Sequence, residues 1–473
     1  MDGIASKCRY YAMRIGMLPL AFLGVGLYRA WLATFFRYDA FPTIEFFDYA
    51  IFEAAIGATS LSMVVFARVL TPLWSNVAAQ RYTAASMSIG SLLIAVGCFG
   101  LPELSETGSS ALKYLGLVLS GSGLALLILM WTEFYGSLNP MRVAVYHAAA
   151  IFLGEILKWL FTGLDATYIV VFSVGLPLLS LDWVIRSMKR LPSFDQPRRM
   201  ESLPTASFPW KPIVLMEVCT FATGFGALPD QPLLAGNLVG TMLVTAFVFF
   251  GALSSSKWFN FDTIYRLAFP LITIGFLFIV PMLPSNPQGA AACYDAGYTM
   301  LSMFIMIVLS NITYRFGISA VWLNGIERGI RYLIEPLGWG VYALVSATES
   351  AHTLNVVHIA IMMAVAAVVV ALIGPERRLS AKWGINLKEE APGDDLFSPG
   401  HLAMRVAELS RERNLSPREE EVLQLLARKE STAQIEADLL VAQGTVKAHT
   451  SRIYRKLQVH SREELYELLG VKN

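Results

Sequence analysis

Charged residues are scarce in this sequence: Asp, Glu, Lys and Arg make up 15% of its 473 residues, whereas hydrophobic residues make up 55%. A soluble globular protein carries about 25% charged residues. Most of this chain is therefore not built to face water. The 37 basic and 36 acidic residues nearly cancel to a net charge of +1, which indicates neither a nucleic-acid partner nor its absence.

Cysteine is scarce too. The four cysteines (Cys8, Cys98, Cys219 and Cys293) lie far apart, mostly within apolar runs, and show no spacing typical of a metal site. A purely extracellular disulfide scaffold is therefore excluded. The chain also contains no G-x-S-x-G, Walker-loop or H-E-x-x-H pattern. We accordingly expect no catalytic residues, no cofactor and no metal.

The few charges are unevenly distributed. Residues 1–374 contain 41 charged residues, whereas the 99 residues from 375 to 473 contain 32. The density of charge thus rises about threefold. Such a step implies two solvents, lipid for the first part of the chain and water for the second.

Long apolar runs fill the first part. About twelve runs are long enough, at about 20 residues, to cross a bilayer as helices. They lie near 15–36, 48–68, 82–101, 112–134, 142–162, 166–186, 212–229, 233–254, 264–284, 294–315, 332–348 and 354–374. The first run follows Lys7, Arg9 and Arg14 and exceeds the length of a cleavable signal peptide, so we expect it to be a true span.

The positions of Lys and Arg between the spans predict the orientation. With a cytoplasmic N-terminus, the cytoplasmic segments carry seventeen Lys and Arg residues, and the outer loops carry only Arg37 and Lys113. This count places Arg328 and Arg331 in a cytoplasmic loop. Because the number of spans is even, the C-terminus is cytoplasmic as well. We therefore predict a multi-pass protein of the plasma membrane with both termini in the cytoplasm.

A basic loop rich in Pro and Ser, at 187–211, divides the predicted membrane domain (1–374) into halves of six spans at 11–186 and 212–374. Six plus six spans resemble the major facilitator architecture. That family carries a Gly-x-x-x-Asp-Arg-x-Gly-Arg pattern between the second and third spans. Here the loop reads ARVLTPLWSNVAAQRY, without Asp or Gly, which puts coupled transport in doubt.

Ionisable residues within spans are costly and are therefore candidates for function. Arg29, Glu53, Glu155 and Lys158 lie at similar depth in the outer third of the first six spans. Two interpretations stay open, a structural ion-pair network and a polar cavity that takes a small molecule from outside. The acids nearer to span ends are expected to reach the polar interface: Glu133, Asp182 and Glu217.

The polar tail begins with a linker at 375–411 and continues as a predicted helical domain at 412–473. Ser416 and Glu419 form a capping box, with Pro417 at the first helical position. Further helices are expected from Ser431, over about 443–457, and from Ser461. Four short helices, of which the second and third are tightly joined, are typical of a helix-turn-helix domain.

The third of these helices is basic. It bears Lys447, Arg452, Arg455 and Lys456 and no acidic residue. Such a helix, following a helix and a turn, suits the phosphate-lined major groove of DNA. On charge alone, a protein-binding module with a solvated basic face stays open as an alternative.

The stretch from LSPREEEVL to IYRKLQV, including G-T-V-K-x-H at 444–449, resembles the LuxR/GerE-type DNA-binding domain over about 412–470. The resemblance implies that Lys447, Ala448 and Ser451 face base edges of double-stranded DNA. It also implies residues that contact or approach phosphates: Thr445, Arg452, Arg455 and Lys456. The fourth helix would pair two copies into a homodimer. Ala442 stands where the family usually has a capping Ser, at a cost of about 1 kcal/mol.

These features predict an all-α, membrane-anchored, one-component transcription regulator. The membrane domain would sense an unknown small molecule, and the four-helix tail would bind DNA. The combination looks like the membrane-integrated regulators of the LuxR family. Two alternatives remain: a transporter-like protein whose fused tail couples transport to transcription, and an anchored DNA-binding protein whose membrane helices sense nothing.

Overall fold

The computed structural model describes two compact units, the larger comprising Met1–Met188 with Pro197–Ala391 and the smaller Pro392–Asn473 with Lys189–Gln196. The described residues are 19–36, 46–67, 71–100, 105–191, 209–226, 238–253, 287–348 and 412–469, with short gaps at 139, 317, 428–430 and 440 and a few isolated residues besides. Within them every regular element is helical. The all-α prediction is thereby confirmed.

The larger unit begins with six apolar helices that coincide with the first six predicted spans. The first is α2 (Gly24–Phe36), preceded by the short 3-10 helix η1 (Leu20–Leu23). The others are α3 (Phe46–Phe66), α4 (Val77–Phe99), α5 (Glu106–Gly136), α6 (Pro140–Phe161) and α7 (Ala166–Arg190). A second 3-10 helix, η2 (Leu73–Ser75), lies between α3 and α4.

The second half contributes α8 (Trp210–Gly226), α9 (Leu238–Leu253), α11 (Pro287–Phe316) and α12 (Ala320–Thr348). The spans predicted near 264–284 and 354–374 lie outside the described residues, so the count of twelve stays a prediction. Helix α12 begins well before the predicted span at 332–348. Arg328 and Arg331 therefore lie buried within a helix, and their assignment to a cytoplasmic loop was wrong.

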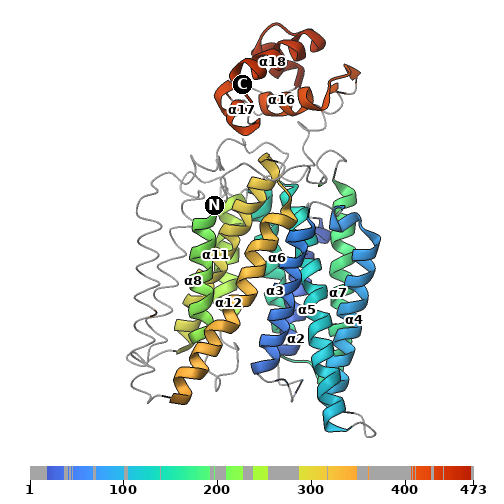
Figure 1. Cartoon of the computed structure of the whole chain (residues 1–473), viewed down its shortest axis with the longest axis vertical. Coiled ribbons are helices and arrows are strands. Elements are labelled where there is room, and N and C mark those ends of the chain that lie inside the picture. The colour runs from blue at the N-terminus through green and yellow to red at the C-terminus, as the bar shows by residue number, and fades with distance from the viewer. Residues whose placement is uncertain are drawn as a thin grey trace, which may run out of the picture. The chain divides into compact units, whose positions relative to one another are not determined.

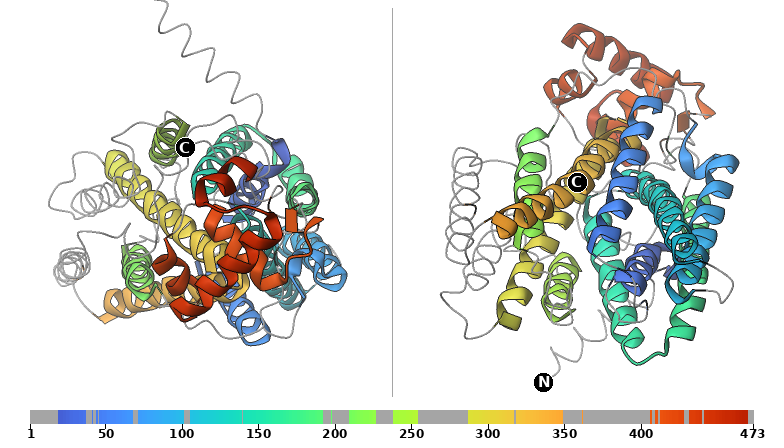
Figure 2. Two further views of the ribbon diagram at one scale, coloured as in Figure 1. Left: turned by 90° about the horizontal axis from the view of Figure 1, so that it is seen from above. Right: turned by 60° about the horizontal axis from the view of Figure 1, so that its bottom comes forward.

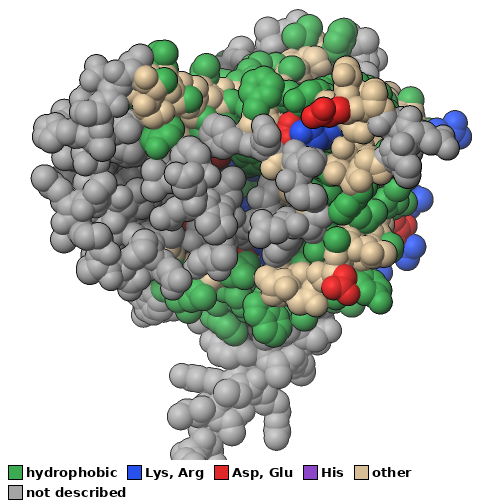
Figure 3. All heavy atoms as spheres, turned by 90° about the horizontal axis from the view of Figure 1, so that it is seen from below, with side chains coloured by type: hydrophobic (Ala, Val, Ile, Leu, Met, Phe, Trp, Pro, Cys, Tyr) green, Lys and Arg blue, Asp and Glu red, His purple; other side chains and the backbone are tan. Residues whose placement is uncertain are grey.

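Six of the described helices (α3, α4, α5, α6, α7 and α11) are long and apolar enough to cross a membrane, and α2, α8 and α9 contain shorter apolar stretches. Large apolar side chains such as Val65, Val171 and Leu243 are exposed on them. Figure 3 shows the same surface character from below: described side chains there are mostly hydrophobic, and charged ones are few. The larger unit is thus a multi-pass membrane bundle.

Helices of the two halves pack against each other within this bundle. Helix α12 contacts both α3 and α8, and α6 contacts α2, α9 and α11. In Figure 1, α2 to α7 gather toward the right, and α8, α11 and α12 lie toward the left. Figure 2 shows the bundle from two further sides. Glycine permits the closest approaches: a Cβ at Gly26 in α2 would collide with the backbone oxygen of Ala150 in α6, and Gly57 of α3 faces Gly329 of α12.

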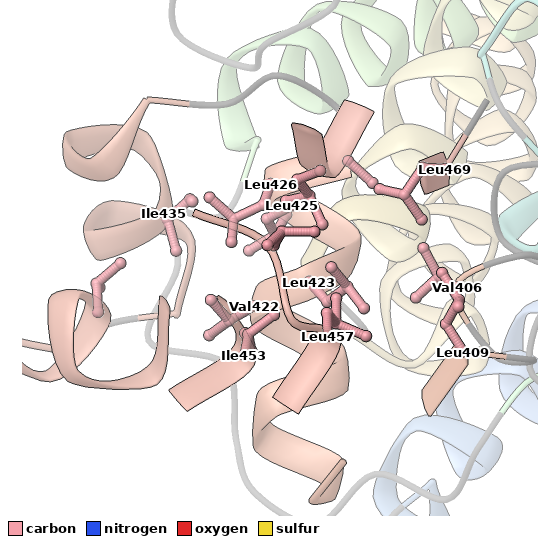
Figure 4. Packing of buried hydrophobic residues seen from close by; sticks show 14 residues of the cluster. Val406, Leu409, Val422, Leu423, Leu425, Leu426, Ile435, Ile453, Leu457 and Leu469 are labelled. Carbon is pink, nitrogen blue, oxygen red and sulfur yellow. The ribbon is translucent and has the colours of Figure 1, made fainter. Parts of the chain in front are cut away.

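The smaller unit consists of α16 (Pro417–Ala427), α17 (Thr432–Leu439), α18 (Gln443–Leu457) and α19 (Arg462–Leu469), as the sequence predicts. Its own hydrophobic core is drawn in Figure 4 and includes Val422, Ile435, Ile453 and Leu469. The sequence assigned Val406 and Leu409 to the linker, but both are part of this core. Because the core is complete within the unit, we expect the tail to fold without the membrane bundle.

Helix caps fix the ends of these short helices. The amide N–H of Ser416 donates to Glu419 Oε2 at 2.8 Å, and the Glu419 N–H donates back to Ser416 Oγ at 3.3 Å. The capping box predicted for α16 is therefore confirmed. At the start of α19, Ser461 Oγ accepts from the Glu464 N–H at 3.0 Å, and Glu464 Oε2 accepts from the His460 N–H at 2.8 Å. Ala442 provides no side-chain cap for α18, as expected.

Candidate functional site

Helix α18 separates a buried apolar face from an exposed polar one. Val446, Ile453 and Leu457 point into the core. The exposed side chains include six of the seven residues predicted to contact DNA: Thr445, Lys447, Ala448, Ser451, Arg452 and Arg455. The 3.6-residue period of the helix explains this separation, because the core positions recur on one side only. The helix therefore presents three free-standing cations and three small side chains to solvent.

Lys456, the seventh predicted contact, lies differently. Its Nζ donates to Glu419 Oε2 at 2.7 Å and to the backbone oxygen of Asn414 at 2.8 Å. Burial raises the pKa of Glu419, but hydrogen bonds from Lys456 and Ser416 outweigh burial and hold that pKa at about 2. Lys456 thus ties α18 to the capping box of α16. Its charge is engaged within the unit, in contrast to the exposed Lys447 and Arg455.

A groove of about 700 Å³ runs beside the exposed face of α18. Three predicted contact residues line it: Lys447, Ser451 and Arg455. The sequence reasoning missed its other lining residues, which are Thr432, Thr450, Tyr454, Gln458, Val459 and His460. Thr432 comes from the start of α17, Thr450 and Tyr454 come from α18 itself, and the other three come from the segment that follows α18. A groove with lysine, arginine and hydroxyl groups is suited to phosphate oxygens.

In the membrane bundle, three of the four candidate residues meet. Lys158 Nζ lies 2.7 Å from Glu155 Oε1, and Arg29 Nη2 lies 3.7 Å from the same oxygen. The side chain of Glu155 is 2% exposed and that of Arg29 is 32% exposed. Glu53 does not join this cluster, although it is equally buried. Two cations therefore share one carboxylate between α2 and α6.

A second buried charge cluster lies within α12. Glu327 pairs with Arg331 one turn later and with Arg328 at 3.2 Å. Arg331 also donates to Ser302 Oγ of α11 at 3.2 Å. The sequence reasoning missed this cluster because it read the stretch as a loop.

Of the three acids expected at the membrane interface, one agrees with the expectation and two do not. Asp182 is exposed and pairs with Arg186 at 2.7 Å, which agrees with the expectation. The expectation was wrong for Glu133 and Glu217, which are 3% and 6% exposed. Glu133 accepts hydrogen bonds at 2.9 Å from the backbone N–H groups of Leu73 and Trp74. Glu133 therefore binds η2 to the bundle. The sequence does not reveal this structural role, because Glu133 is far in sequence from Leu73 and Trp74.

Comparison with known proteins identifies the smaller unit. Residues 413–469 match the family model described as "Bacterial regulatory proteins, luxR family". These residues form a LuxR-type helix-turn-helix domain. The "Putative HTH-type transcriptional regulator YhjB" of Escherichia coli (strain K12) is 38% identical over 61 residues, which are 13% of this chain and 30% of that protein. The chain thus spans less than a third of this curated relative, and the likeness concerns the LuxR-type domain alone.

The larger unit is similar in fold to solved membrane transporters. The crystal structure of a bacterial homologue of the iron transporter ferroportin, in an outward-facing state, aligns with a TM-score of 0.51 at 12% identity. The alignment covers 75% of this chain and 97% of that one. FucP, a Major Facilitator Superfamily transporter, aligns over 75% of this chain and 98% of its own at 13% identity, with a TM-score of 0.43. The first likeness shows a transporter-like fold and nothing about transport.

The ion pair between Lys456 and Glu419 leads to a stability prediction for the LuxR-type domain. Lys456→Met should lower its free energy of unfolding by about 1–2 kcal/mol, because a nearly buried carboxylate loses a charged donor. The stabilising effect of Glu419 is present above the pKa of an unfolded glutamate and disappears as the pH falls toward about 2. Urea unfolding of the domain at pH 7 and at low pH measures both effects. Arg452→Met, which removes an exposed cation, is the matched control; equal losses in both variants would contradict the assignment.

Proposed function

We propose that this protein is a membrane-anchored, one-component transcription regulator that receives a signal through its membrane bundle and binds DNA through its LuxR-type domain. The observation that carries the proposal is the presence, in one chain, of a transporter-like bundle and a LuxR-type domain with an exposed basic helix. Regulation of transcription requires that the LuxR-type domain lie on the cytoplasmic side of the membrane, where the DNA is.

In this proposal α18 enters the major groove of double-stranded DNA. Lys447 reads base edges together with Ala448 and Ser451, which are small and offer little direct readout. Thr445, Arg452 and Arg455 hold the phosphate backbone. Lys456 approaches the backbone from its ion pair with Glu419.

The signal reaches DNA through pairing of two copies. Helix α19 is the proposed dimer face of the LuxR-type domain, and two tails tethered in one membrane gain effective concentration when their bundles approach each other. A ligand that binds one state of the bundle better shifts this balance by its differential affinity alone. The proposed entry point for a small molecule from outside is the cluster of Arg29, Glu155 and Lys158, with Glu53.

Topology reporters test the proposal directly. Tags inserted at residue 200 and at the C-terminus should both be cytoplasmic, and tags at 106 or 288 should lie outside, because the basic loops favour the cytoplasm. The side of the membrane is measured by placing a single cysteine in each tag and testing whether a membrane-impermeant reagent labels it in intact cells. A tag at 200 and one at the C-terminus on opposite sides of the membrane would rule the proposal out.

The transporter alternative is favoured by the fold of the larger unit alone. Uptake of a substrate into vesicles that contain the purified protein, driven by an ion gradient, would favour that alternative over a pure receptor.

A further inference from the structure

Two buried acidic side chains of the membrane bundle form no ion pair with any residue that the structure describes. Glu53 of α3 is 1% exposed and Glu217 of α8 is 6% exposed. No described residue donates a hydrogen bond of good geometry to either carboxylate, although Tyr49 and Glu335 lie within hydrogen-bonding reach of Glu53. A buried carboxylate that is not compensated is costly, and nearly all buried polar groups in native proteins have a partner. These two acids therefore require a cation or a proton that the described side chains do not provide.

Glu53 and Glu217 belong to one acidic neighbourhood around α12. Glu335 lies within electrostatic reach of both. Arg331 is a neighbour of Glu217 and of Glu335, but its ion pair is made with Glu327. The described residues around α12 thus include four carboxylates (Glu53, Glu217, Glu327 and Glu335) and two guanidinium groups (Arg328 and Arg331), so that two negative charges are in excess when all are ionised. By contrast, Glu155 is fully compensated by Lys158 and Arg29.

Aromatic side chains border the same acids. The ring of Tyr49 packs against that of Trp339 at 4.9 Å between centroids, and Tyr49 is also a neighbour of Glu53 and Glu335. Tyr298 of α11 shares a hydrogen bond of 3.2 Å with Thr220 of α8 and lies near Glu217. Carboxylates flanked by aromatic rings are the groups that recognise organic ammonium ions, through charge and through cation–π attraction.

We propose that Glu53, Glu217 and Glu335 form a recognition site for an organic ammonium ligand, in which the ammonium group provides the missing positive charge and Tyr49, Tyr298 and Trp339 flank its apolar part. The inference rests on the proposed function, since it names the chemical class of the signal, and it offers the acids around α12 as the alternative binding site to the cluster of Arg29, Glu155 and Lys158. A bare metal ion fits less well, because the described residues contain no group of three or more acidic, histidine or cysteine side chains able to hold one. Hard cations in proteins take six or more oxygen ligands.

The test uses the full chain in lipid nanodiscs and benzylammonium chloride as the probe. Benzylammonium should raise the unfolding temperature by several degrees, because a ligand that binds only the folded state stabilises it. Benzyl alcohol and sodium benzoate, which have the same ring without the positive charge, should have no such effect. The shift should disappear in Glu53→Gln and in Glu217→Gln, and should persist in Glu106→Gln, whose carboxylate is exposed at the start of α5.

Absence of a benzylammonium shift in the unaltered protein would overturn the proposal and would indicate that protons alone neutralise the acids. An equal shift with benzyl alcohol, or an equal shift in both Gln variants, would overturn it too. If one variant fails to fold, the other carries the comparison. Transcription is measured separately: a shift that depends on Glu217, with no effect of any bound ligand on a reporter gene, would uphold the site and reject the proposed regulation.

Discussion

Lys447→Ala is expected to remove the sequence preference of the LuxR-type domain and to weaken its binding to the preferred DNA by about 1–3 kcal/mol, or roughly fivefold to 150-fold. Lys447 is exposed on α18 and lines the groove beside it, and its neighbours on the reading face, Ala448 and Ser451, are too small to compensate. The measurement is selection of duplexes from a random pool by fragment 401–473, followed by titration of the selected and of unrelated DNA.

Arg455→Ala is the matched control because it removes an exposed cation from the same helix. This substitution should lower the affinity for all duplexes alike. It should also reduce the slope of log K against log salt concentration by about the amount that one phosphate contact contributes. Lys456→Met should instead reduce stability, since this side chain is held by Glu419. Unchanged affinity and preference in Lys447→Ala would show that α18 does not read the bases.

Much of the LuxR-type domain could be predicted because its determinants are local. A capping box is visible within four residues, and the core positions of α18 recur with the helical period. The role of Lys456 could not be predicted from charge alone, since Glu419, its partner, lies 37 residues away in sequence. Arg418 was concealed in the same way: it donates to the backbone oxygen of Leu439 at 3.0 Å and ties α16 to α17.

For the membrane bundle, the sequence predicted the helices well but misassigned the buried charges within them. Apolar runs predicted the described spans well, because lipid contact requires a continuous stretch of about 20 apolar residues. The same criterion assigned Arg328 and Arg331 to a loop, since charges lower the hydropathy of a window. In the structure those charges are neutralised by neighbours on α12 itself, as in the pair of Glu327 and Arg331. The i,i+4 spacing of Glu327 and Arg331 is visible in the sequence, but it indicates an ion pair only where a helix is expected. The hydrogen bond from Arg331 to Ser302 of α11 depends on which helices pack together, and no single-sequence pattern reveals it.

Glu155→Gln is expected to abolish the transcriptional response to the signal. The substitution leaves Arg29 and Lys158 without their shared carboxylate. Loss of one partner from a buried ion pair costs about 3–5 kcal/mol, so a fall in membrane level alone could mimic loss of signalling. The decisive variant is therefore Glu155→Gln combined with Lys158→Met, which restores neutrality to the buried pair.

The double variant separates the two interpretations of this cluster. If the cluster is only a structural ion-pair network, the double variant should recover its membrane level and respond to the signal as fully as the unaltered protein. If the cluster receives the ligand, membrane level and basal DNA binding should recover while the response stays absent, because two of its three charges are gone and only Arg29 remains. Immunoblotting of membranes, a DNA-binding assay and a reporter gene in the same cells measure these quantities. A full response from the double variant would reject the cluster as a ligand site and leave the acids around α12 as the remaining candidates.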